Sequence, residues 1–177
     1  DSALRLILEA GALCNDSQLV PPTPEESRWR AAGDPTEAAL LTLALKGCIE
    51  PVGIRQEWPR RAEIPFDSAA KLMATQHGHT HRPNRVILKG APEILVPLCH
   101  HADEARILSA TEEMAGRALR LLAVAMIDDA EIDEDAGFSQ FQGRPVFLGL
   151  VGQMDPPREE VKSAVAACRA AGIRPVM

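Results

Sequence analysis

Aromatic residues are scarce in this chain, at 3% of its 177 residues and with no tyrosine. The core must therefore rest on Leu, Val, Ile and Ala, and a phenylalanine among polar residues needs an explanation. No apolar run approaches the roughly 18 residues that a membrane-spanning helix needs. The N-terminal stretch DSALRLILEAGALC lacks a basic region and a cleavage site, so no signal peptide is expected.

Positive charge is in deficit, because 19 Lys and Arg stand against 25 Asp and Glu, for a net charge of −6. This balance argues against a nucleic-acid partner or an anionic membrane surface. A nucleotide remains compatible with it, since one pocket can be basic on an acidic surface. The mass of 19.1 kDa fits one domain and a fragment of a second.

Paired cysteines and the familiar phosphate-binding loops are missing. The cysteines have no CxxC spacing and lie in apolar segments, which indicates buried thiols in a reducing, cytosolic compartment. They are Cys14, Cys48, Cys99 and Cys168. Neither GxxxxGK[ST] nor GxGxxG occurs, and no GxSxG turn marks a serine hydrolase. Any nucleotide would therefore be held more by its base than by a backbone loop around its phosphates.

Two clear helices and several strands are predicted from the residues that are present. Ala3 to Cys14 is typical of an amphipathic helix, and DPTEAALLTLALKG predicts a largely buried one. In the second helix Asp34 can cap, Pro35 suits the first position, Glu37 sits at N3, and Gly47 ends the helix. Strands are predicted at RAEIPFDS, KLMATQH, NRVILKG, LRLLAVAMI and PVFLGLVGQM.

A further helix is predicted in APEILVPLC, and another in DPPREEVKSAVAACRAAG. Between them, a capping box at Ser109–Glu112 predicts the start of a helix that runs to about Leu119. A short strand is expected after Gly172. VPPTPEESRWRAAG and the acidic stretch DDAEIDEDAG are predicted loops. Antiparallel hairpins with helices indicate an α+β fold, whereas the helix–strand unit from about Asp155 onward is typical of a separate parallel α/β domain.

Three places combine residue types that suit a nucleotide. Phe66 stands at a strand end beside polar residues, where a ring can stack on a flat base, worth about 1–3 kcal/mol. Lys71 follows nearby, and Lys89-Gly90 stands where a strand gives way to a helix, so that glycine admits a ligand and lysine supplies charge. Each place also has a plain interpretation: a plug at the core edge, an exposed lysine, and a turn.

Glu37 and Arg120 are two further candidates, each with two interpretations. The Glu37 carboxylate can accept a hydrogen bond from an exocyclic amine, or it can serve only the capping box. Arg120 begins an apolar strand, so its guanidinium either extends to solvent or points into a pocket as an anion clamp.

The histidines give a different possibility. HGHTHR places His77, His79 and His81 at alternate positions, which on a strand would share one face and could bind a metal. A hairpin loop is poorly preorganised for that purpose, so no metal site is predicted.

Six stretches together resemble the P-type cation-transporting ATPases. CNDS, GDPTEAAL, IPFDSAAKLM, VILKGAPE, ALRLLAVA and MDPPREEV…CRAAGI occur in the order and approximate spacing of that family. They look like the type-2 branch that moves calcium, or sodium and potassium. The resemblance spans nearly the whole chain and implies the nucleotide-binding domain, with an antiparallel sheet flanked by helices.

The resemblance implies domain bounds, cofactors and partners. Residues 1–154 would form the nucleotide-binding domain, without its first strands, and residues 155–177 the DPPR hinge and the start of the phosphorylation domain. ATP with Mg²⁺ would be bound, and the partners would be the phosphorylation, actuator and transmembrane domains of the parent chain. The position would be the cytoplasmic part of an integral membrane protein, and the fragment itself is expected to be soluble.

The resemblance also implies roles for individual residues. Phe66 would stack on adenine, Lys71 would lie near the base and ribose, and Glu37 would lie near the adenine amine with Thr36 beside it. The two lysines would rim one cleft. Lys89 and Gly90 would line its floor and Arg120 would reach the phosphates. The full predicted set is Thr36, Glu37, Phe66, Lys71, Met73, Lys89, Gly90 and Arg120.

The chain departs from the family in several ways. DKTGT, which carries the phosphorylated aspartate, does not occur, nor do a TGD motif or membrane spans. Ala70 stands where many members carry arginine, and Ala69 and Leu72 replace commonly charged positions, which would weaken phosphate contact. The chain is therefore expected to act as part of an ATPase and to be inactive alone. The alternatives are a histidine-loop metal-binding module and a protein-interaction fragment with a vestigial pocket.

Overall fold

The computed structural model describes residues 2–155 and 158–176, so Pro156 and Pro157 of the predicted hinge lie outside the described residues. Its centre is an antiparallel sheet with the order β3-β4-β5-β6-β7. The strands are β3 (Arg60–Asp67), β4 (Leu72–His77), β5 (Arg85–Gly90), β6 (Arg120–Asp128) and β7 (Val146–Gln153). Each matches a predicted strand. The predicted α+β class, an antiparallel sheet flanked by helices, is confirmed.

One end of this sheet collects most of the predicted site. Antiparallel pairing brings the ends of β3, β5 and β7 beside the starts of β4 and β6. One row of paired residues crosses the sheet there, through Asp67, Leu72, Gly90, Ala123 and Leu150. We call this the Gly90 end of the sheet.

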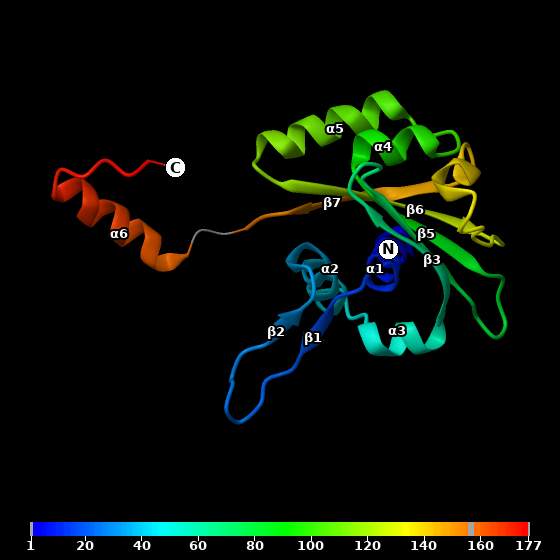
Figure 1. Ribbon diagram of the computed structural model, residues 1–177, viewed down its shortest axis with the longest axis horizontal. Helices are drawn as coiled ribbons and strands as arrows, with labels where there is room; N and C mark the ends of the chain where they lie inside the picture. The colour runs from blue at the N-terminus through cyan, green and yellow to red at the C-terminus, as the bar shows by residue number, and fades with distance from the viewer. Residues whose placement is uncertain (1, 156–157, 177) are drawn as a thin grey trace.

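Helices cover both faces of the sheet (Figure 1). The face called here the α1 face carries α1 (Ser2–Leu13), α2 (Pro35–Lys46) and α3 (Pro51–Glu57). The opposite α5 face carries α4 (Pro92–Leu95), which continues into the 3₁₀ turn η1 (Val96–Leu98), and α5 (Glu104–Gly116). A second 3₁₀ turn, η2 (Gly137–Phe141), precedes β7.

Strand alternation divides the core between the two faces. Met73, Ile87 and Val124 pack toward the α1 face, whereas Leu72 and Leu88 pack toward the α5 face. Successive side chains of a strand point to opposite sides, so a strand covered on both faces is buried at every position. This explains why β4 is buried along its whole length and β5 along nearly all of it.

Helix α2 begins and ends as its capping residues predict. The Asp34 side chain accepts hydrogen bonds from the first-turn amides, Pro35 occupies the first turn, and Gly47 is the C-cap. The helix is less buried than predicted, because Leu43 and Leu45 are exposed.

Several predicted details are wrong. Helix α5 begins at Glu104, because Asp103 caps it through the amide of Arg106, so Ser109–Glu112 lies inside the helix. Residues 173–176 form no strand, since no neighbouring strand is described there to pair with them. The thiols also differ from expectation: Cys14 is buried, but Cys48 is exposed and the other two are partly exposed.

Some elements were not predicted. The strands β1 (Gln18–Val20) and β2 (Arg30–Ala32) form a small antiparallel hairpin around the Pro-rich loop, and the short helix α3 follows α2. Figure 1 shows the last helix, α6 (Glu159–Ala170), apart from the sheet. Among the described helices, none has the length and apolar character needed to cross a membrane.

Candidate functional site

Phe66 lies in solvent. The side chain, one residue before the end of β3, is 61% exposed, so the interpretation as a core plug is wrong. A single exposed apolar side chain is common on protein surfaces. Its position at the Gly90 end, in a chain with so few aromatics, is what makes it a candidate for stacking.

Lys71 is an exposed side chain with one weak partner. It occupies the turn between β3 and β4 with φ of 53°, a left-handed conformation. Its Nζ lies 3.0 Å from Glu93 Oε1, and both side chains are more than half exposed. The pKa of Glu93 is lowered, first by a hydrogen bond from its own backbone amide and then by Lys71. An exposed pair of this kind contributes about 0–1 kcal/mol, so the lysine is easily released.

Lys89 is in a very different environment. Only 5% of it is exposed, and its Nζ donates to the Cys14 carbonyl oxygen at 2.6 Å and to Glu37 Oε1 at 2.7 Å. A buried ammonium group is stable only with a close anion and further hydrogen bonds. Lys89 therefore joins β5 to the end of α1 and the start of α2.

The two lysines do not rim one cleft in this structure. Lys71 bonds to Glu93 of α4, on the α5 face, whereas Lys89 bonds to the ends of helices on the α1 face. Lys71 occupies a left-handed turn, where the alternation of strand side chains does not apply. Its long exposed stem allows the ammonium group to reach another partner.

Gly90 is required by the neighbouring strand. A Cβ at this position would collide with the carbonyl oxygen of Lys71 and lie 2.6 Å from Leu72 Cδ2. That same carbonyl accepts a hydrogen bond from Ala91 N at 3.0 Å. The glycine at the end of the strand thus allows close packing of backbone against backbone.

Glu37 uses both carboxylate oxygens within the protein. Oε1 accepts from Lys89, and Oε2 accepts from the amide of Asp16 at 2.8 Å. The carboxylate therefore ties α2 to its neighbours instead of closing the expected capping box. Each carboxylate oxygen has two lone pairs, so a further donor can still bind.

Thr36 is held from two strands. Its hydroxyl oxygen accepts from Arg120 Nη1 at 2.9 Å, and its carbonyl oxygen accepts from Gln153 Nε2 at 2.9 Å. Arg120 is exposed at the start of β6, so its guanidinium is at the surface and already hydrogen-bonded. The first turn of α2 is thereby fastened to the Gly90 end of the sheet.

Met73 lies below the surface. Only 1% of it is exposed, and it pairs with Lys89 across β4 and β5 in the core under α1. Its side chain supports the neighbourhood of Lys89 from inside, and its predicted contact with a ligand stays a prediction.

Residues of the CNDS motif complete this network, although sequence reasoning gave them no role. Asn15 is buried, and its Nδ2 donates to the carbonyl oxygens of Glu37 at 2.8 Å and Gly11 at 3.1 Å. Its Oδ1 accepts from the amide of Ser17. The sequence feature that could have indicated this role is the polar run directly after an apolar helix, because the last carbonyl groups of a helix need hydrogen-bond donors.

His77 is not available as a metal ligand. The imidazole is 1% exposed, Nδ1–H donates to the Trp58 carbonyl oxygen at 3.0 Å, and Nε2 accepts from the Thr75 hydroxyl at 2.9 Å. Burial lowers its pKa to about 4, so the ring is neutral. His79 lies beside Glu57 instead. The described residues contain no group of three His, Cys, Asp or Glu suited to a metal, and the histidine-loop alternative is not supported.

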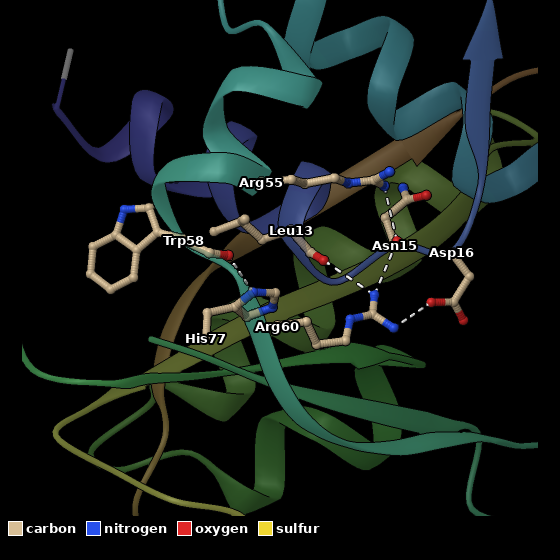
Figure 2. Close-up of a pocket in the computed structure, with 7 residues that line it drawn as sticks. All are labelled: Leu13, Asn15, Asp16, Arg55, Trp58, Arg60 and His77. Atoms are coloured by element: carbon tan, nitrogen blue, oxygen red, sulfur yellow. Dashed lines mark hydrogen bonds and ion pairs between the residues drawn. The ribbon is translucent and has the colours of Figure 1, made fainter. Parts of the chain in front are cut away.

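A pocket of about 270 Å³ lies beside Asn15 and Asp16, which bond to Glu37 (Figure 2). Its lining residues are Leu13, Asn15, Asp16, Arg55, Trp58, Arg60 and His77. None belongs to the predicted nucleotide set. The guanidinium groups of Arg55 and Arg60 bond to carbonyl oxygens in the last turn of α1 and just after it, so the pocket wall supports the CNDS turn.

Comparison with known proteins identifies the family. The family model of the P-type ATPase cytoplasmic domain N matches residues 3–160. The probable cation-transporting ATPase F of Mycobacterium tuberculosis is 39% identical over 98% of this chain and 20% of its own length.

Two further relatives agree. The calcium-transporting ATPase of Bacillus subtilis is 34% identical over 98% of this chain and 20% of its own length. The cation-transporting ATPase pma1 of Synechocystis is 36% identical over 94% of this chain and 19% of its own length. This chain thus spans about a fifth of the length of these relatives. It belongs to the family of P-type ATPase cytoplasmic N domains.

Proposed function

We propose that this chain is the ATP-binding domain of a P-type cation-transporting ATPase and holds the adenine end of ATP at the Gly90 end of its sheet. The observation that carries the proposal is the solvent-exposed ring of Phe66, at the end of the sheet where Lys89 fixes the Glu37 carboxylate. An exposed ring and a preset acceptor are what a flat base with an amino group needs.

The residues at this end would divide the nucleotide between them. Phe66 would stack on the purine, and the Glu37 carboxylate would accept a hydrogen bond from its amino group. Lys71 would leave Glu93 for the ribose and phosphates, at the cost of one exposed ion pair. Arg120, next to Thr36 at the surface, would pair with phosphate oxygens, for which its planar guanidinium is suited.

In the parent protein, the domain would deliver the γ-phosphate to an aspartate of a neighbouring phosphorylation domain. Such transfer depends on positioning and on charge neutralisation by Mg²⁺, which would arrive with the triphosphate as part of the substrate. Residues 1–154 would form the nucleotide-binding domain, and the chain from residue 155 would lead through a hinge to the next domain. The relatives' names support transport of a cation, and we propose calcium.

The direct test is ATP titration of the 177-residue chain, followed by calorimetry or by amide NMR signals. We expect Phe66→Ala to weaken ATP binding about 5-fold to 150-fold, the range for loss of one stacked ring, and Phe66→Trp to retain binding. Trp29→Ala is the matched control, because Trp29 is also an exposed aromatic but precedes β2. Equal ATP affinity of the wild type and Phe66→Ala would overturn the proposal.

A further inference from the structure

The end of α1 is capped by side chains from three other elements. The last carbonyl groups of a helix have no partner within it and attract cations. Arg55 Nε donates to the Ala12 carbonyl oxygen at 3.1 Å, and Lys89 donates to that of Cys14. Arg60 Nη2 lies 3.4 Å from the Leu13 carbonyl oxygen and 3.1 Å from that of Asn15.

Arg60 also bonds to the side chain of Asp16, the residue after Asn15. Its Nη1 lies 2.6 Å from Asp16 Oδ1, while Nη2 holds the carbonyl of Asn15 (Figure 2). Arg55 Nη2 donates to the same carbonyl oxygen at 2.9 Å. One peptide group, Asn15 C=O with Asp16 N–H, is thus held on its oxygen side by two guanidinium groups.

The other side of this peptide group faces Glu37. The Asp16 N–H donates to Glu37 Oε2 at 2.8 Å, and Asn15 Nδ2 donates to the Glu37 carbonyl oxygen. A trans peptide is planar, so its C=O and N–H point in opposite directions. Fixing the carbonyl oxygen of Asn15 therefore fixes the direction in which the Asp16 amide points.

We infer that Arg60 is a positioning residue that presets the Glu37 carboxylate through the Asn15–Asp16 peptide group, and thereby sets the preference for a 6-amino purine. The inference rests on the proposed function. Arg60 touches no part of the nucleotide in this scheme. Its guanidinium orients the peptide and polarises it, because hydrogen bonds in a chain strengthen one another.

Inosine triphosphate provides the decisive comparison with ATP. Its base has a carbonyl oxygen in place of the amino group, so it presents an acceptor to the acceptor Glu37. The wild-type chain should prefer ATP. A loss of folded protein would lower the apparent affinities for both nucleotides equally, whereas a misdirected carboxylate would lower the affinity for ATP selectively. The ratio of the two affinities therefore separates positioning from general stability.

The experiment measures both dissociation constants by calorimetry for the wild type, Arg60→Ala and Arg61→Ala, with thermal unfolding to verify folding. Arg61 is the matched control, since its exposed side chain carries the same charge one residue away. We expect the ATP preference to fall about threefold to tenfold in Arg60→Ala, the range for one hydrogen bond, and to stay unchanged in Arg61→Ala. Arg60→Lys, which keeps the charge without the fork, replaces Arg60→Ala if that variant does not fold and should also lose preference.

A double variant completes the test. Glu37→Gln alone should lower the ATP preference, and adding Arg60→Ala to it should change the ratio no further, because both act on one acceptor. An unchanged ratio in a folded Arg60 variant that binds ATP would overturn the inference and leave the proposed function intact. A wild-type chain that binds neither nucleotide would overturn the proposed function itself.

Discussion

The Gly90 end of the sheet has two halves that differ in how firmly their side chains are held. The held half consists of Glu37, Lys89 and the Asn15–Asp16 peptide group, which are linked by short hydrogen bonds, and Lys89 and Asn15 are buried. The open half consists of Phe66, Lys71 and Arg120, which are exposed and carry few bonds. Preset groups give specificity with little loss of entropy on binding, whereas open ones can follow a ligand.

This difference fits the two parts of a nucleotide. A base is rigid and carries fixed donors and acceptors, so a rigid acceptor suits it. A triphosphate is flexible and, in the proposed mechanism, must reach another domain. Long, exposed cationic side chains can accompany it. The held half would therefore set which base binds, and the open half would set how strongly the phosphates are held.

The largest expected effect is on stability and falls on the held half. Lys89→Met keeps the apolar stem but removes the donor to Cys14 and the cation next to Glu37, whose side chain is only 15% exposed. Loss of one partner of a buried pair leaves the other charge uncompensated, so we expect the free energy of unfolding to fall by about 3 kcal/mol. Urea denaturation measures it.

Lys71→Met is the control for this prediction. It removes the same charge from the open half, where the pair with Glu93 is exposed, and should cost under about 1 kcal/mol. Equal losses of unfolding free energy in Lys89→Met and Lys71→Met would contradict the distinction between the two halves.

Acid should loosen the support of the held half. His77 lies in the pocket wall beside Arg60, and its pKa of about 4 in the folded chain is below the ordinary value of 6.5. Above pH 6.5 neither state is protonated and stability is full. As the pH falls below 6.5, only the unfolded chain gains this proton, so stability is progressively lost down to about pH 4. By pH 5 the loss should be about 2 kcal/mol.

The measurement is urea denaturation at pH 7.5 and at pH 5. This range lies above the ordinary titration of carboxyl groups, so it isolates the histidine contribution. His77→Gln should start less stable at pH 7.5 and show a flatter dependence on pH. A slope that persists unchanged in His77→Gln would assign the acid sensitivity to another group.

Local signals made much of the fold predictable. Asp34, Pro35 and Gly47 mark α2 because capping and backbone restrictions act within a few residues. The strands were predictable as short strand-like runs bounded by turn residues. The start of α5 was missed because Asp103 and Ser109 are both acceptable caps, and tertiary packing decides between them. The pairing of β1 with β2 was hidden by the Pro-rich loop between them.

For the candidate site, the sequence proposed residues but not the contacts among them. Motif resemblance selected Phe66, Lys89 and Glu37, and the structure brings the last two into direct contact. Sequence could not reveal that Lys71 and Lys89 bond on opposite faces, since Lys71 is in a left-handed turn. Nor could it reveal the contact of Asp16 with Glu37, because 21 residues separate them and only the packing of α1 on α2 joins them.

The smallest expected effect sharpens the account of the open half. Glu93→Gln removes the partner of Lys71, and the released ammonium group should raise ATP affinity about twofold, the scale of an exposed ion pair. Any lost negative charge favours an anionic ligand, so Glu104→Gln, at the first position of α5, is the matched control. The ATP affinities are measured by calorimetry at low salt and at 0.3 M salt, a value chosen to screen surface charge. At low salt the gain in affinity should be larger in Glu93→Gln than in Glu104→Gln, and at 0.3 M this difference should shrink to about zero. Equal gains in both variants would mean that Lys71 does not move from Glu93 to the nucleotide, and that the open half holds phosphates through Arg120 alone.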